Sequence, residues 1–262
     1  MNTSGKRICA VIAVLLLNAS LLPRAEAQSR LALEPGTVQL MALANEARAA
    51  AGAAPLRWDN ALAEAARKHC LRMAAEGPIA HRYPGELDLS ERAGLAGVHF
   101  DMVEENVAIG PTPAVIHDEW MHSTGHRDNM LNPDVDRVGI AVIASRGVLY
   151  ATADYAHGVE AFSQTEIEKH VAELIRPSGV PIGGSAPMAR AACTMESGVP
   201  RSSGLMQPLF VMRWQDSDLG HLPKELSREL ATGRYREASV GSCEPSGAVG
   251  PFTAYRVAVL LY

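Results

Sequence analysis

Two histidines and one glutamate, His81, Glu105 and His126, are the side chains in this sequence best suited to forming a binding or reactive site. Two neutral imidazoles and a carboxylate, with one coordination position left open, are the ligand types of an exposed zinc site. Without a metal, the same groups can hold a water molecule in a hydrogen-bond network, with Glu105 fixing one imidazole tautomer. The structural alternative is that the histidines satisfy buried backbone groups and that Glu105 and Asn106 cap loops.

His126 follows an apolar helical run that reaches Trp120. We expect Gly125 to break this helix and to remove side-chain bulk beside the imidazole ring. Asn132-Pro133 is expected to close the segment as a turn. This arrangement places His126 at the mouth of a fold.

Other catalytic patterns are weak or missing. His117 and His122 lie five residues apart, which is not the His-Glu-x-x-His spacing of a zinc protease, and we interpret them as surface residues. Glu104 and Glu105 do not form an acid–base pair, because neighbouring side chains diverge on a regular backbone. The sequence contains no G-x-S-x-G elbow, phosphate-binding loop or dinucleotide fingerprint.

The first 27 residues are typical of a signal peptide. Lys6 and Arg7 precede an almost wholly apolar run over residues 8–22, and Ala25-Glu26-Ala27 offers a cleavage site of the small-x-small type. The run is short for a membrane span. We therefore expect a secreted or periplasmic protein that has no transmembrane anchor after cleavage.

The charge balance argues against nucleic acid as a partner. Removal of residues 1–27 takes away three basic residues and one acidic residue, which changes the formal net charge from −5 to −7. A mildly acidic chain without a basic stripe matches neither a nucleic-acid-binding protein nor one that binds anionic membranes.

Three cysteines remain after cleavage. The helical pattern around Cys70 indicates a buried thiol. Cys193 and Cys243 both lie in the C-terminal part, and a disulfide between them is the simplest prediction for an oxidising compartment.

The elements between residues 28 and 160 mix helices with antiparallel strands. After an extended lead-in, helical spacing begins at Thr37 and ends at Gly52, and a second helix follows its N-cap Asp59. Thr112 caps another helix with Pro113 at its first position. Further segments are a helical turn at residues 89–94 and a strand hairpin formed by 138–143 and 148–153. This pattern predicts the α+β class.

Composition changes after a predicted helix at residues 164–176. Residues 177–185 are rich in Pro, Gly and Ser, and we assign 161–186 as a helix and linker. Residues 187–262 are predicted to form a small α+β unit of unknown role, in which we find no chemistry. Its predicted elements are strands near 189–194, 207–214, 236–242 and 252–262, with a helix at 223–230.

Residues 37–156 closely resemble the CAP superfamily, which comprises the cysteine-rich secretory, antigen 5 and pathogenesis-related 1 proteins and is also known as the SCP domain. Each motif is weak alone, but the ordered set is specific, and Gly-His-Arg-x-Asn is of the bacterial type. The motifs are Asn45 with Arg48, Pro55-Leu56-x-Trp58, His81, Glu105-Asn106-Val107-Ala108, Trp120 with Gly125-His126-Arg127-x-Asn129-Met130-Leu131, and the hairpin from Val138 to Tyr155.

The resemblance implies an α-β-α sandwich over residues 28–160, with a broad cleft lined by two histidines and two acids. Some members bind a divalent metal there through the histidines. On this chain the histidines are His81 and His126, the first acid is Glu105, and the position of the second acid is occupied by Ser123. The expected cleft residues are therefore His81, Glu105, Asn106, Ser123 and His126, with Zn²⁺ or another divalent cation held by His81 and His126.

Three functions are consistent with such a cleft. The first is a secreted binding module for a small apolar molecule, a peptide or a cell-envelope component. The second is an extracellular hydrolase that uses His81, Glu105 or His126 for catalysis. The third is an envelope-interaction role in which residues 187–262 act as the adaptor. The binding module is favoured mainly because the catalytic set is incomplete. The sequence also shows no nucleophile beside a base.

Overall fold

The computed structural model describes residues 34–200, 206–247 and 250–262 of the chain. The predicted signal peptide, residues 1–27, lies outside these residues. Among the described helices, none is both long enough and apolar enough to cross a membrane. Residues 34–160 make up the N-terminal region, and residues 161–262 make up the C-terminal region.

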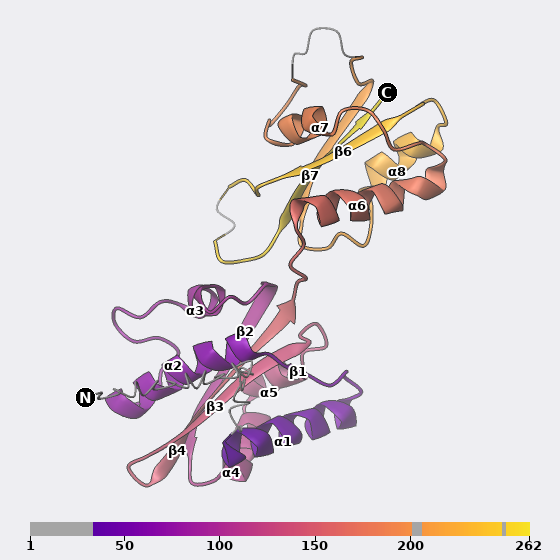
Figure 1. Ribbon diagram of the computed structural model, residues 1–262. Helices are drawn as coiled ribbons and strands as arrows, with labels where there is room; N and C mark the ends of the chain where they lie inside the picture. Colours follow the sequence, from indigo (N-terminus) through magenta and orange to yellow (C-terminus); the bar gives the residue numbers. More distant parts are fainter. Residues whose placement is uncertain (1–33, 201–205, 248–249) are drawn as a thin grey trace, which may run out of the picture. The chain divides into compact units, whose positions relative to one another are not determined.

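The N-terminal region is built on a four-stranded sheet (Figure 1). The strands lie in the order β1-β3-β4-β2, with β1 parallel to β3 and the other pairs antiparallel. The β3–β4 hairpin confirms the predicted one. In chain order the elements are α1 (Pro35–Ala51), β1 (Arg57–Trp58), α2 (Asn60–Glu76), α3 (Leu89–Leu95), β2 (Phe100–Gly110), α4 (Pro113–His122), α5 (Thr124–Leu131), β3 (Arg137–Ser145) and β4 (Val148–Gly158).

Helices cover both faces of this sheet. Leu40 of α1, Trp120 of α4 and Met130 of α5 form one core with alternate residues of β3 and β4. On the other face, α2 supplies Cys70 and Met73 to a second core. The predicted α-β-α sandwich is confirmed, and it follows from strands whose two faces are both apolar.

Local sequence signals define several helix boundaries. The Asp59 side chain accepts hydrogen bonds from the backbone N–H groups of Ala61 and Leu62 at the start of α2. Thr112 caps α4 in the same way, with Pro113 following it. These are the predicted caps, and they satisfy N–H groups that have no partner within the helix.

The C-terminal region holds a three-stranded antiparallel sheet in the order β5-β7-β6. Its elements are α6 (Gln164–Ile175), the 3₁₀ turn η1 (Arg176–Ser178), α7 (Ala186–Cys193), β5 (Phe210–Asp216), α8 (Lys224–Ala231), β6 (Ala238–Cys243) and β7 (Tyr255–Leu261). The predicted α+β character and most predicted elements agree with this structure.

The strand predicted near residues 189–194 is wrong, because that segment forms helix α7. Ser185 caps the helix, and Pro187 lies in its first turn. The buried Met188, Ala189 and Ala192 follow helical spacing. An alanine-rich segment has high helix propensity.

Helices pack on both faces of the second sheet as well. Ile167, Val171 and Ile175 of α6 join one core together with Leu226 of α8. Helix α7 packs on the opposite face. Helix α6 therefore contributes to the core of the C-terminal region, although the sequence grouped it with the linker.

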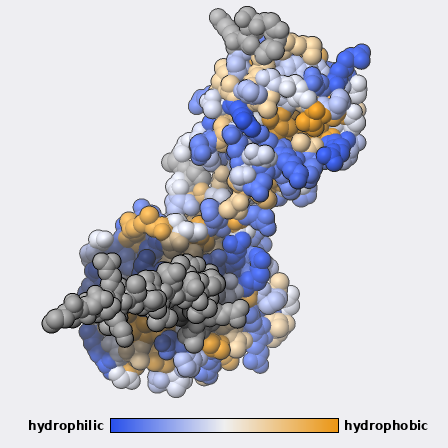
Figure 2. Space-filling model, in the orientation of Figure 1, coloured by the Kyte–Doolittle hydropathy of each residue, from blue (hydrophilic) through white to orange (hydrophobic). Residues whose placement is uncertain are grey.

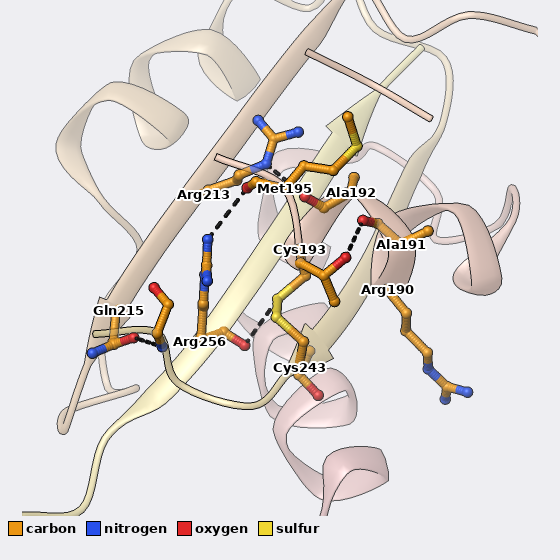
Figure 3. Close-up of a disulfide and its surroundings, with 12 residues drawn as sticks. Arg190, Ala191, Ala192, Cys193, Met195, Arg213, Gln215, Cys243 and Arg256 are labelled. Carbon is orange, nitrogen blue, oxygen red and sulfur yellow. Dashed lines mark hydrogen bonds between the residues drawn. A yellow bond between two sulfur atoms is a disulfide. The ribbon is translucent and has the colours of Figure 1, made fainter. Parts of the chain in front are cut away.

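The predicted disulfide between Cys193 and Cys243 is present and joins the end of α7 to the end of β6 (Figure 3). Cys70 is free and buried, as predicted. On the face drawn in Figure 2, hydrophilic residues predominate and apolar residues are exposed in separate groups.

Candidate functional site

The candidate site is organised by β2, which is an edge strand of the first sheet. Consecutive side chains of a strand point to opposite faces. Glu105 accordingly lies on the α2 side of the sheet, and Asn106 lies on the α5 side. Both residues are buried, with exposures of 6% and 0%. One strand therefore anchors residues from both helical layers.

Glu105 holds His81 by a hydrogen bond of 2.8 Å between Oε1 and the ring Nδ1. Its other oxygen, Oε2, accepts from the guanidinium of Arg92 on α3. The Glu105 side chain is only 3% exposed, whereas the His81 side chain is 61% exposed. An exposed imidazole is thus supported from below by a buried ion pair.

The loop that carries His81 is fixed by His69, a buried residue of α2. Its Nδ1 lies 2.8 Å from Oε1 of Glu86, and its Nε2 lies 2.9 Å from the carbonyl oxygen of Ala80. Arg92 also donates to the carbonyls of His81 and Leu87. These contacts connect the loop on both sides of His81 to α2 and α3.

His126 lies in the first turns of α5 on the other side of β2. Asn106 donates from Nδ2 to the carbonyl oxygen of His126 over 2.8 Å. Asn129 donates to Oδ1 of Asn106 over 3.1 Å and to the carbonyl oxygen of Glu105 over 3.2 Å. Side chains of α5 and β2 therefore satisfy groups at the open edge of the sheet, which also fixes α5 there.

The helix break before His126 differs from the expectation. It occurs at Ser123, whose extended backbone ends α4 and precedes α5, and Gly125 lies inside α5. A Cβ atom built on Gly125 meets no atom within 4 Å, so the glycine creates no space that a side chain would fill. The expected roles of Gly125 are wrong, and Ser123 is the joint between the two helices.

The two histidines have opposite electrostatic environments. The hydrogen bond from Glu105 raises the pKa of His81 above its usual value. Partial burial, followed by the positive charge of His81, lowers the pKa of His126. The two pKa values are driven apart, and His81 is the histidine that is easier to protonate.

The expected metal ligands are His81 and His126. A catalytic zinc site uses three protein ligands, but the described residues contain no group of three His, Cys, Asp or Glu side chains placed to hold an ion. His81 directs Nδ1 to Glu105, so Nε2 is the ring nitrogen that a metal ion would take. Zinc binding by His81 and His126 stays a prediction, and we derive no chemical step from it.

The structure adds three residues that sequence reasoning missed. His69 is one turn from Ala66 and Met73 on the buried face of α2, so helical spacing was an available signal. Arg92 follows the Asp88-x-x-Glu91 capping box of α3, but no pattern showed that it reaches Glu105. Asp154 of β4 lies directly opposite Glu105, a register that the sequence does not reveal.

The remaining titratable residues behave mostly as expected. Glu104 contacts Asn132, away from the Arg92 and His81 contacts of Glu105, so the two glutamates do diverge. His122 is exposed. His117 is half-buried, which corrects its assignment to the surface.

Comparison with known proteins identifies a family over part of the chain. The sequence profile of the cysteine-rich secretory protein family, CAP, matches residues 41–155. The uncharacterised protein YkwD of Bacillus subtilis (strain 168) is 29% identical over 111 residues, which are 42% of this chain and 43% of YkwD. The uncharacterised membrane protein YlbC of the same organism is 32% identical over 106 residues, covering 40% of this chain and 30% of YlbC.

The chain thus spans less than half the length of these curated relatives. A solved extracellular protein containing an SCP domain, from Bacillus anthracis str. Ames, is 25% identical with a TM-score of 0.43, covering 46% of this chain and 40% of that protein. The motifs, the α-β-α sandwich and the profile match agree with one another. Residues 41–155 of this chain form a domain of the cysteine-rich secretory protein (CAP) family.

Proposed function

We propose that this CAP domain is a secreted or periplasmic binding module. His81, Ser123 and His126 form its ligand-binding surface, and the buried Glu105 and Asn106 hold it from beneath. The ligand classes are a peptide, a small apolar molecule or a cell-envelope component. The apolar segment before residue 27 and the disulfide support a location outside the cytoplasm.

The observation that carries this proposal is the support of an exposed histidine by a buried ion pair. An exposed ion pair contributes only about 0–1 kcal/mol to stability. Burial of Glu105 and Arg92 costs several kcal/mol of desolvation per ion, which their attraction offsets only with good geometry. Fold stability alone gives little reason to retain such an arrangement, whereas the orientation of His81 toward a ligand does.

Among the three ligand classes, the site favours a peptide. When His81 is protonated, its Nδ1–H donates to the Glu105 carboxylate and its Nε2–H is left as a donor for a ligand oxygen. A neutral His126 offers an acceptor nitrogen. A peptide group presents one carbonyl and one N–H, and so it complements a donor and an acceptor that lie on opposite sides of β2.

The test is a titration of residues 28–262 with a panel of short peptides, fatty acids and cell-wall fragments, followed by NMR. We expect a hit whose affinity falls at least about tenfold in His81→Ala and does not change in His122→Ala. His122 is the matched control, because it is an exposed histidine on α4. Equal affinity of the parent and His81→Ala for every hit would refute the proposal.

A hydrolase is the second candidate, and the opposite pKa shifts of His81 and His126 are the observation that favours it. A neutral His126 can act as a general base, and a cationic His81 can stabilise developing negative charge. In this case His126→Gln should abolish turnover of a peptide or ester without weakening binding. If the parent protein binds a peptide but does not turn it over, the hydrolase is refuted and the binding module is the remaining candidate.

A further inference from the structure

Asp154 lies beneath the proposed site in a position that the mechanism above does not use. It is directly opposite Glu105 in the antiparallel ladder between β2 and β4. Opposite residues of such a ladder share one face, with Cβ atoms about 4.5–5.5 Å apart. The two carboxyl groups are therefore neighbours on the α2 side of the sheet.

The packing of α2 closes Asp154 off from solvent. On β3, the other neighbour of β4, the residue paired with Asp154 is Gly139. A Cβ atom on Gly139 would lie 2.0 Å from the backbone nitrogen of Ala63, so α2 approaches the sheet here as closely as a glycine allows. Asp154 is 0% exposed as a result.

The positive charge of Arg92 favours ionisation of Asp154, but burial and the charge of Glu105 act against it. Within the described parts of the chain, neither carboxyl oxygen of Asp154 has a hydrogen-bond partner. The guanidinium of Arg92 instead donates to Glu105 and to the carbonyls of His81 and Leu87.

The charged and titratable groups around the Asp154–Glu105 pair come from β2, from α3, from α2, which also carries Cys70, and from the loop before α3. Strand β2 contributes Glu105 and α3 contributes Arg92. Helix α2 contributes His69, which lies 3.8 Å from Oε2 of Glu105. The loop before α3 contributes His81 and, on the far side of His69, Glu86. Burial, followed by the charge of Glu105, raises the pKa of Asp154 well above its usual value.

An ionised Asp154 would place a second buried carboxylate beside Glu105 with no donor of its own. Burial of a carboxylate without hydrogen bonds is so unfavourable that such a group takes up a proton instead. When two carboxyl groups share one site, one of them keeps its proton. Glu105 has hydrogen-bond partners in Arg92 and His81, so Asp154 is the carboxyl group of the pair that lacks a donor.

We propose that Asp154 is a carboxylic acid at neutral pH, that its O–H donates to the Glu105 carboxylate, and that it is a positioning residue for His81. Glu105 then receives donors from three directions: Asp154 from β4, Arg92 from α3 and His81 from the loop. This fixes the rotamer of Glu105 and hence the direction in which His81 presents Nε2. The importance of this orientation for a ligand rests on the proposed function, but the hydrogen bond itself does not.

The test uses infrared difference spectroscopy and NMR on the ligand-free protein, so its outcome is independent of whether any ligand binds. At pH 7 we expect the carbonyl-stretch band of a protonated carboxyl group, and we expect Asp154→Asn to lose it. Asparagine keeps the size of the side chain and a donor to Glu105. The low-field Nδ1–H resonance of His81 should therefore persist in Asp154→Asn and be lost in Asp154→Val.

Two results would overturn the proposal. Absence of the band in the parent protein, or its persistence in Asp154→Asn, would show that Asp154 holds no proton. An unchanged His81 resonance in a folded Asp154→Val variant would show that the acid does not position the histidine. If the valine variant does not fold, the infrared comparison with Asp154→Asn still decides the first point.

Discussion

Replacement of Arg92 by methionine should destabilise the N-terminal domain strongly. The change keeps an unbranched side chain but removes the guanidinium that is paired with Glu105. The Glu105 side chain is 3% exposed and that of Arg92 is 7% exposed. Removal of one partner from a buried ion pair costs about 3–5 kcal/mol. The lost donors to the carbonyls of His81 and Leu87 add little, because water can reach this partly exposed loop.

This loss is a large fraction of a typical folding free energy of about 5–15 kcal/mol. Urea unfolding of residues 28–262, followed by circular dichroism and tryptophan fluorescence, should show a midpoint roughly 1–2 M lower than in the parent. The double variant Arg92→Met, Glu105→Gln should be more stable than Arg92→Met alone, since no buried charge is then left without a partner.

Arg67→Met is the matched control. Arg67 lies on the exposed face of α2 and forms a pair with Glu64 at 3.6 Å, with both side chains about half exposed. Its loss should cost less than about 1 kcal/mol. If Arg92→Met costs no more than Arg67→Met, Glu105 does not depend on Arg92 and the electrostatic account of the site is wrong.

Three other predictions concern separate features. Arg48 is fully buried and donates to four backbone carbonyls, so Arg48→Met should cost about 2–4 kcal/mol in thermal unfolding, and an unchanged melting temperature would contradict this. Because the pKa of His81 is raised in the folded state, protonation of His81 stabilises the fold. This stability is fully present below the unfolded pKa of about 6.5 and is lost as the pH rises through the folded pKa. His81→Gln should therefore lower the melting temperature only on the acid side. The pKa of His126 is lowered, so this residue destabilises the fold at acid pH, and His126→Gln should raise the melting temperature on the acid side. If the melting temperatures of the two variants change with pH in the same way, the opposite pKa shifts of His81 and His126 are contradicted. Replacing Cys193 and Cys243 by alanine should destabilise the C-terminal region by about 4 kcal/mol for a closed loop of 50 residues, which calorimetry would detect as a shift of one transition.

The sequence predicted the fold best where two local signals coincide. For α2 and α4, a capping residue precedes an apolar pattern at helical spacing, so the start and the buried face were both evident. Over residues 186–193 the side chains are mostly small and apolar, and such a segment fits a strand or a helix equally well by periodicity. The cap Ser185 was the available signal for α7.

The site was only partly predictable for a physical reason. His81, Glu105 and Asn106 carry recognisable motifs, and the structure brings His81 to Glu105 and Asn106 to His126. Two neighbours of Glu105 that the sequence did not reveal, Arg92 and Asp154, come from α3 and β4. Their contributions depend on strand register and helix packing, which short patterns do not encode.

The side chains of Glu105 and Asn106 point to opposite faces of β2, and this has a consequence for folding. The loop of His81 is anchored to the α2 layer, and the helix of His126 is anchored to the opposite layer. Neither layer alone carries both rings, so a ligand that contacts both histidines can bind only a chain in which the whole sandwich has assembled. Such a ligand would act as a clamp across the sheet edge, adding about 2.7 kcal/mol of stability at a concentration one hundred times its Kd. In a compartment with abundant ligand, occupancy of this site and resistance of the domain to unfolding would rise together.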